Sequence, residues 1–319
     1  MAIDELADDT LVLFPFGIGS PVPFLERITL TDELSIAYET LGRYLGKKPG
    51  AIMSAEIGGM NSVVPLAVAS RLGLPVIDGD GMGRAYPEVQ LATFTLYGQK
   101  ATPMAVADEH GNVVVIDTID SLWAERLARP VAVVMGAIAG GVGFPLTVKQ
   151  LKESAVLGTV TYAQQIGAAI HKAHREHSDP VKAVLGATKG FELLSGRIVD
   201  VQRKTERGWA LGEARIAGTD DFAGREMVVR FQNENLVAID NGEIVASVPD
   251  LITILDSERG DAITTEHLRY GFHVSVVAMP CDEKWRTPAG VELGGPRHFG
   301  YDIDYVPVEQ RFASLAGKR

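Results

Sequence analysis

The sequence predicts a two-domain protein in which an α/β domain is followed by a mostly β domain. In the first half of the chain, strand-like apolar runs alternate with helix-like periodicity, which favours a parallel or mixed sheet covered by helices. After Gly190, short strand-like segments are separated by tight turns, as is typical of a barrel or sandwich. We therefore expect a three-layer α/β/α domain over residues 1–185 and a barrel-like β domain over 186–319.

Composition argues against several classes of protein. The chain has 319 residues, of which 46% are hydrophobic and 22% charged, as in globular enzymes. A net charge of −11 argues against nucleic acid or an anionic membrane as a partner. The single cysteine excludes an intramolecular disulfide framework and suits a reducing compartment. Because the amino terminus also lacks a secretory pattern and no apolar run is long enough to cross a bilayer, we expect a cytoplasmic protein.

The elements of the first domain follow from periodicity and from helix-ending residues. Pro130 is expected to end a helix over 120–128, and Val131–Met135 is then expected to be a buried strand, followed by a glycine-rich stretch over 136–143. Strands are also expected over 11–16, 51–56 and 75–78, a hairpin over 104–108 and 113–117, and helices over 34–45 (capped by Thr31 or Asp32), 61–72 (capped by Asn61 or Ser62), 87–96, 147–155 and 162–177.

The second domain is expected to consist mainly of short strands. A long tail over 287–308, rich in glycine, proline and aromatic residues, is expected to be ordered. The expected strands cover residues 193–204, 209–216, 225–232, 235–239, 243–248, 251–255 and 272–278.

Residues 51–88 hold the strongest functional signal. A strand, a glycine turn, a helix and a second strand follow one another, and a right-handed crossover of this kind makes the two strands parallel. Glu56 ends the first strand, and Asp78 and Asp80 end the second. Because parallel neighbours end at the same edge of a sheet, we expect these acids to gather where open α/β sheets bind ligands.

Different interpretations of this acidic edge stay open. The carboxyl groups could serve as general acid and base, or a divalent cation such as Mg²⁺ or Mn²⁺ could be held by Glu56, Asp78 and Asp80. Alternatively, the acids only cap turns and form ion pairs. The residues expected to bind a substrate nearby are Gly58, Gly59 and Asn61 at the start of the helix, and Arg84 and Glu88 after the second strand.

Further binding candidates lie in the second domain. Asn233 and Asn235 could offer amide groups to a polar ring, although a turn or an edge strand explains them equally well. Arg297, in a glycine-rich and aromatic segment, is a further candidate, and an ordered loop held by charge pairs is its alternative explanation.

Two other reactive residue types are interpreted as ordinary. His171, His174 and His177 are spaced so that all three do not share a helix face, which indicates a polar helix end instead of a metal site. Cys281 has acidic neighbours, which raise a thiol pKa, so a nucleophilic role is not expected.

Seven segments together resemble a known family. Over almost its whole length the chain is similar to the S-methyl thiohydantoin desulfurase family, formerly domain of unknown function 917. The resemblance implies a three-layer α/β domain followed by a β-barrel-like domain. The family typically also carries a Gly-Thr-Gly-Gly-Gly-Gly segment ahead of the strand that corresponds to 11–16, and this sequence departs from the pattern there. The segments that carry the resemblance are 56–61, 78–88, 108–112, 231–236, 248–251, 285–288 and 295–305.

The resemblance implies hydrolytic desulfurisation of an S-methyl thiohydantoin-type cyclic imide, in which water replaces the sulfur substituent. On this hypothesis Glu56 or Asp80 activates the water and Asp78 orients it, while Arg84 holds an acidic group on the ring. A homo-oligomer is expected. The alternative is a non-catalytic accessory or ligand-binding partner of a hydantoinase or oxoprolinase. A nucleotide-binding enzyme is disfavoured because the phosphate-binding fingerprints are missing.

Overall fold

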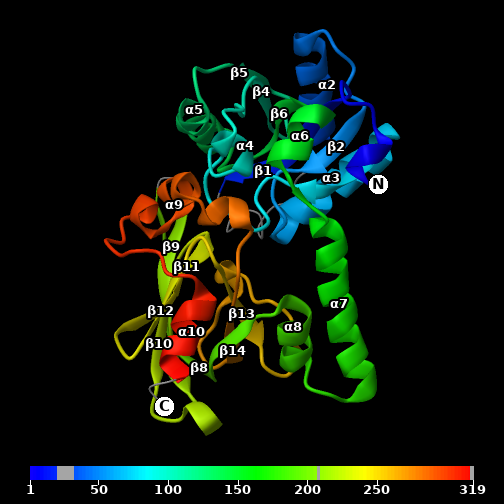
Figure 1. Cartoon of the computed structure of the whole chain (residues 1–319). Coiled ribbons are helices and arrows are strands. Elements are labelled where there is room, and N and C mark those ends of the chain that lie inside the picture. Colours follow the sequence, from blue (N-terminus) through cyan, green and yellow to red (C-terminus); the bar gives the residue numbers. More distant parts are fainter. Residues whose placement is uncertain (20–31, 207–208, 317–319) are drawn as a thin grey trace. The chain divides into compact units, whose positions relative to one another are not determined.

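The computed structural model describes residues 1–19, 32–206 and 209–316, which form two compact units (Figure 1). The first unit is formed mainly by Met1–Thr161, and the second by Tyr162–Glu206 and Ala210–Arg319. Among the described residues, no helix is long and apolar enough to span a membrane. The first unit is α/β and the second is mostly β, as the sequence predicts. The expected boundary near residue 185 lies beyond the end of the first compact unit at Thr161.

The first unit is built on a mixed seven-stranded sheet with the order β5-β4-β6-β1-β2-β3-β7. Strands β1, β2 and β3 are parallel, which confirms the predicted crossover, and the other pairings are antiparallel. The strands are β1 (Leu11–Gly19), β2 (Ala51–Ser54), β3 (Val76–Asp80), β4 (Met104–Ala107), β5 (Val113–Ile116), β6 (Ile138–Thr147) and β7 (Val156–Leu157).

Helices cover both faces of this sheet. On β1, Leu13 packs with buried residues of α2 and α3, whereas the next residue, Phe14, packs edge-on against Phe94 of α4 at 5.0 Å between ring centroids. Successive strand residues point to opposite faces, so the two helix layers lie on opposite sides of the sheet. The helices of the first unit are α2 (Glu33–Leu45), α3 (Gly59–Leu72), α4 (Thr93–Leu96), α5 (Ser121–Val134) and α6 (Val148–Ser154).

Two expectations about helices are wrong in detail, and a third holds in position only. Gly58, and neither Asn61 nor Ser62, is the N-cap of α3. Asp32 is the N-cap of α2, as expected, but its side chain makes no capping hydrogen bond, and Thr31 lies outside the described residues. The helix expected over 87–96 is reduced to the four residues of α4.

The region after Pro130 also differs from the expectation. Helix α5 continues through Pro130 to Val134, so Val131–Met135 is not a buried strand. Instead, the glycine-rich stretch forms β6, which is buried almost throughout. Glycine is disfavoured in strands, but here it is required by packing. A Cβ at Gly141 would lie 2.5 Å from the ring of Phe16, and one at Gly140 would lie 3.2 Å from Leu34.

The second unit is a seven-stranded antiparallel sheet with the order β12-β11-β10-β9-β8-β14-β13. The sheet curls into a half-barrel, and β13 lies close to β11 and β12 at the opposite end of the strand order. Its expected strands are thereby confirmed. They are β8 (Phe191–Glu206), β9 (Trp209–Gly218), β10 (Glu226–Gln232), β11 (Glu234–Asp240), β12 (Glu243–Ser247), β13 (Leu251–Asp256) and β14 (His273–Met279).

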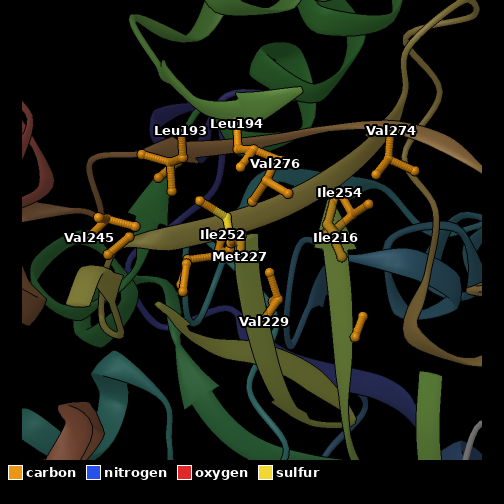
Figure 2. Packing of buried hydrophobic residues seen from close by; sticks show 14 of the residues in the cluster. Leu193, Leu194, Ile216, Met227, Val229, Val245, Ile252, Ile254, Val274 and Val276 are labelled. Carbon is orange, nitrogen blue, oxygen red and sulfur yellow. The ribbon is translucent and has the colours of Figure 1, made fainter. Parts of the chain in front are cut away.

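The core of the second unit lies on the concave side of the curled sheet. Figure 2 shows side chains from several strands meeting there, among them Leu194, Val229, Ile254 and Val276. The helices of this part of the chain are α7 (Thr159–Glu176), α8 (Pro180–Thr188), α9 (Pro288–Gly294) and α10 (Val308–Ala316). The expected tail over 287–308 is ordered and contains α9, and α10 begins at its last residue.

Candidate functional site

The carboxyl ends of β1, β2 and β3 form the candidate site. Glu56 lies two residues after β2 ends, and Asp80 is the last residue of β3. The main-chain N–H of Ile57 donates a 2.9 Å hydrogen bond to Oδ2 of Asp80. This bond joins the segment after β2 to the end of β3, so the two acids are held at one edge of the sheet, in line with the topology of a parallel crossover.

Glu56 is a half-buried residue whose carboxylate is held at both oxygens. The amide nitrogen of Asn61 donates to Oε1 over 2.6 Å, and the main-chain N–H of Tyr86 donates to Oε2 over 3.1 Å. Burial raises the pKa of Glu56 to about 7, against the lowering effects of Asn61, the Tyr86 N–H and the charge of Arg84. At neutral pH this carboxyl group can therefore both accept and release a proton.

Asn61 orients Glu56 and does not cap the helix. Its side chain also bonds β1, because the N–H of Gly17 donates to its Oδ1 over 2.8 Å. Because its oxygen is used by Gly17, the side chain of Asn61 presents its amide nitrogen, a hydrogen-bond donor, to the carboxylate of Glu56. Gly17 is thus a site residue that sequence reasoning missed. Its only signal is its place at the end of the first parallel strand.

Asp80 is buried completely, and its oxygens bind the backbone around it. Oδ2 accepts the N–H groups of Ile57 at 2.9 Å, Met82 at 3.0 Å and Gly83 at 2.8 Å. Burial raises the pKa of Asp80 to about 7, although these backbone hydrogen bonds act in the opposite direction. Asp80 thus joins the loop after β2, at Ile57, to the loop after β3, at Met82 and Gly83.

Asp78 does not join the other two acids. It accepts the main-chain N–H groups of Val160 and Thr161, each at 3.0 Å, and the hydroxyl of Thr161 at 2.5 Å. Burial, which raises the pKa of Asp78, is outweighed by these hydrogen bonds, so the pKa lies below its ordinary value. Asp78 therefore binds the first turn of α7. The structure gives no support to the expectation that it orients water beside Glu56.

The expectation of a metal site on the three acids is therefore not supported by the geometry. The oxygens of Asp78 and Asp80 are engaged with separate segments of backbone. Over residues 1–19, 32–206 and 209–316, no group of three His, Cys, Asp or Glu side chains is arranged to hold a metal ion. His174 fits its ordinary interpretation, with Nε2 lying 2.8 Å from the carbonyl oxygen of Arg259.

The segment after β3 supplies the remaining groups of the site. The guanidinium of Arg84 is buried and lies over the ring of Tyr86, with 4.2 Å between its central carbon and the ring centroid. Its charge lowers the pKa of Glu56, against the effect of burial. Glu88 instead accepts a hydrogen bond from the side chain of Gln90.

The two glycines of the turn differ in what they do. A Cβ at Gly58 would lie 2.7 Å from the Cβ of Ala85, so packing explains this residue. Gly59 has a φ of +48°, which favours glycine, and open space where a side chain would be. The first turn of α3 therefore faces open space at Gly59, the position at which a ligand could approach the helix N-terminus.

A buried ion pair on α5 supports the segment after β3. Glu125 accepts the main-chain N–H of Val89 at 2.9 Å, and Arg129 donates to the carbonyl oxygen of Pro87 at 3.0 Å. The two side chains also bond each other. Sequence reasoning did not select them, although their i, i+4 spacing on a predicted helix was a usable signal.

The candidates in the second unit have structural partners. Asn233 has a φ of +55° and accepts the N–H of Ala210 at 2.9 Å, as a turn residue does. Asn235 donates to the carbonyl oxygen of Ile252 at 3.1 Å. Arg297 is 62% exposed and pairs with Asp302 and Asp304. These contacts match the turn and charge-pair explanations considered from sequence.

A buried polar network also lies in the second unit. Asp250 accepts the hydroxyl of Tyr305 at 3.0 Å, the N–H of Val308 at 2.7 Å and a guanidinium N–H of Arg286 at 3.1 Å. Burial, and then the charge of Asp250, raises the pKa of Cys281 to about 12. The direction agrees with the sequence-based prediction, but the acid responsible is distant in sequence.

The fold and its acidic edge define a class of protein with an α/β unit followed by a curled β unit. Two family models match the chain. The model of the S-Me-THD-like N-terminal domain matches residues 1–118, and that of the S-Me-THD-like C-terminal domain matches residues 119–308. The chain belongs to the S-Me-THD-like family, which confirms the resemblance found in the sequence. No curated protein matches it.

The fold is also seen in a crystal structure of a protein from Chromobacterium violaceum. The TM-score is 0.79 at 22% sequence identity, over 97% of this chain and 86% of that chain. At this level of identity, the likeness establishes the fold alone.

Proposed function

We propose that this protein catalyses the hydrolytic desulfurisation of an S-methyl thiohydantoin-type ring. Membership of the S-Me-THD-like family supports the substrate class. The observation that carries the proposal is Glu56, a half-buried residue at the carboxyl edge of parallel strands whose carboxyl group has a pKa of about 7. A group that titrates near neutral pH is suited to proton transfer to and from a reacting molecule.

The reaction needs one proton acceptor that later becomes a donor. Water attacks the ring carbon that carries sulfur. As the C–O bond forms, the π electrons of the C=N bond move onto the ring nitrogen, and one proton passes from the water to the Glu56 carboxylate. The C=N bond then re-forms as the C–S bond breaks, and the departing methanethiolate takes the proton from Glu56. The second proton of the water moves from the new hydroxyl group to the ring nitrogen, so a hydantoin and methanethiol result and the carboxylate is regenerated. No oxidation or reduction occurs, so the atoms and charges balance without a further reactant.

The neighbouring groups have supporting roles in this proposal. Asn61 and the N–H of Tyr86 hold both oxygens of Glu56, which fixes the direction of proton transfer. Arg84 and the N-terminus of α3 supply positive potential for an acidic substituent on the ring. Asp80 acts through the backbone of Ile57 and Gly83, as a positioning residue.

The test is methanethiol release by the purified chain alone. The probe is an S-methyl thiohydantoin with a propionate substituent, and the thiol is measured with a chromogenic thiol reagent. We expect Glu56→Gln to lower kcat by about 100-fold or more, the usual contribution of a general base. The wild-type rate should rise with pH through about 7 as Glu56 ionises. Glu39→Gln, an exposed substitution on α2 in the same unit, should leave the rate unchanged.

The result separates the main alternatives. Wild-type turnover in the Glu56→Gln variant would refute the role of Glu56. If the wild-type chain releases no methanethiol alone but does so with a hydantoinase-type partner, the accessory function is the correct one. Full activity after Asp78→Asn would agree with the position of Asp78 at α7.

A further inference from the structure

Helix α5 exposes its large apolar side chains and buries small and charged ones, the reverse of the usual pattern. The side chains that it buries are small or charged: Ala124, Ala128 and Ala132 are buried, together with the Glu125–Arg129 pair. Helix α2 of the same unit buries Leu34, Tyr38 and Leu41 instead, as a helix on a monomeric domain normally does. The large apolar residues of α5 must therefore lie on its other face.

These large apolar residues form an exposed stripe. Val134 is 89% exposed and Ile119, just before the helix, is 79% exposed, while the other four members are between 42% and 48% exposed. At about 100° per residue, the five members within the helix fall in an arc of roughly 140°, so they line one side of it. The α5 stripe consists of Ile119, Leu122, Trp123, Leu127, Val133 and Val134.

The charge pattern of the stripe suits a second copy of this acidic chain. Within α5, from Ser121 to Val134, the exposed side chains include no carboxylate, although the whole chain carries a net charge of −11. The exposed Asp120 lies at the N-cap of the helix, next to Ile119. The one exposed charge within the helix is Arg126, whose guanidinium lies 5.3 Å from the centre of the Trp123 ring. Two negatively charged copies repel each other least where carboxylates are absent.

The area of the stripe also approaches what a stable dimer requires. The six exposed fractions correspond to roughly 600 Å² of surface, compared with about 800 Å² per partner in a standard protein interface. A patch of this size is at the upper limit for a monomer. We propose that the α5 stripe is a self-association surface through which two copies of this chain pair.

The pairing would place the same residues of both copies face to face, because a two-fold interface uses one patch twice. Trp123 and Leu127 lie near the middle of the stripe, where residues that dominate binding usually lie. The proposal concerns α5 and does not depend on the chemistry proposed for Glu56.

Sedimentation of the full chain tests the proposal. We expect the wild type to be a dimer, and Leu127→Glu to raise the dimer Kd by about 100-fold or more, because it buries one charge from each copy at the interface. The matched control is Tyr44→Glu, which adds the same charge at another exposed apolar residue of the first unit, 55% exposed on α2. This control should keep the wild-type Kd. Circular dichroism spectra like that of the wild type, with a cooperative thermal transition, would show that both variants fold; the melting temperature itself can fall in Leu127→Glu because pairing stabilises the folded chain.

Disulfide trapping provides an independent readout. The native Cys281 is buried, so Leu127→Cys introduces a single accessible thiol. Under mild oxidation this variant should form a covalent dimer much faster than Tyr44→Cys does. A wild type that stays monomeric at about 100 µM would overturn the proposal. So would an unaltered dimer Kd in Leu127→Glu, or vesicle binding by a monomeric wild type that Leu127→Glu abolishes.

Discussion

Three acids that lie within 25 residues of one another have three different environments. Glu56 is partly exposed and is held by one side chain and one N–H group. Asp80 is enclosed and holds the backbone of two loops. Asp78 binds the first turn of α7. Since only Glu56 combines some exposure with a pKa near neutrality, it alone is suited to proton transfer with a bound molecule.

At this scale the hydrogen bond from Asn61 limits the rise in the pKa of Glu56 that burial causes. The bond favours the ionised form, so its loss should move the pKa of Glu56 above about 7. We therefore expect Asn61→Ala to shift the pH–rate profile to higher pH, and Asn61→Asp to shift it further, because it adds a second negative charge. Carboxyl titration by NMR with ¹³C-labelled glutamate measures the same shift without substrate.

Asn112→Ala is the control for this pair of variants. Asn112 is an exposed residue of the β4–β5 hairpin, and its amide donates to Asp108 at 2.8 Å instead of to Glu56. Its replacement should leave the titration of Glu56 unchanged. If Asn61→Ala titrates like the wild type, the amide does not tune this carboxyl group.

At the scale of elements, the two faces of α5 carry different kinds of residue. Its inner face carries the Glu125–Arg129 pair, which binds the backbone of residues 87–89. The residue before this segment, Tyr86, provides the N–H that holds Glu56. Its outer face carries the α5 stripe. The helix can extend through Pro130 because proline there costs one backbone hydrogen bond, while the buried alanines before and after it remain packed.

The effects of replacing Glu125 and Arg129 on the free energy of unfolding should not be additive. We expect Glu125→Gln to destabilise the protein by about 3 kcal/mol, because it breaks a buried ion pair by removing one partner. Adding Arg129→Met should recover part of that loss, since the second charge of the pair is then removed as well. Urea unfolding of the two single variants and the double variant measures the coupling.

An exposed ion pair provides the comparison. In α8, Lys182 lies 3.5 Å from Asp179 and is 80% exposed. Lys182→Met should change the free energy of unfolding by less than about 0.5 kcal/mol. Equal effects at Lys182 and Glu125 would show that burial of the α5 pair has no energetic consequence.

At the scale of the molecule, the raised pKa values connect the site to stability. Glu56 has a pKa of about 7 in the folded protein and an ordinary value of 4.5. Between these values the folded state binds more protons than the unfolded state, so the free energy of unfolding falls as pH rises. Below about pH 4.5 both states are protonated, and above about pH 7 both are ionised, so the contribution is constant there.

We expect Glu56→Gln to become more stable relative to the wild type as pH rises from about 4.5 to 7, by about 1–3 kcal/mol. The glutamine cannot ionise, so it avoids the cost of a desolvated charge. Urea unfolding at a series of pH values measures this difference. The Glu39→Gln control should give a difference that does not vary with pH. A constant difference for Glu56→Gln would mean that its folded pKa is ordinary.

The sequence indicated most of the fold because local signals agreed with the tertiary arrangement. The crossover between β2 and β3 is parallel as predicted, and the strands of the second unit lie where their periodicity and turns place them. Prediction failed at β6, where glycine is disfavoured for a strand but is needed for contact with Phe16. It failed also after Pro130, where an apolar run that is typical of a buried strand ends an exposed helix.

The sequence by itself determined the two-domain organisation, the family and the edge of the sheet at which acids collect. Only the tertiary structure decided which acid is suited to chemistry. Asp78 and Asp80 are alternate residues of one strand, yet one binds α7 and the other the loops beside Glu56. The reason is physical: exposure, pKa and hydrogen-bond partners depend on segments such as 82–86 and 159–161, and only folding brings these segments to the strand end.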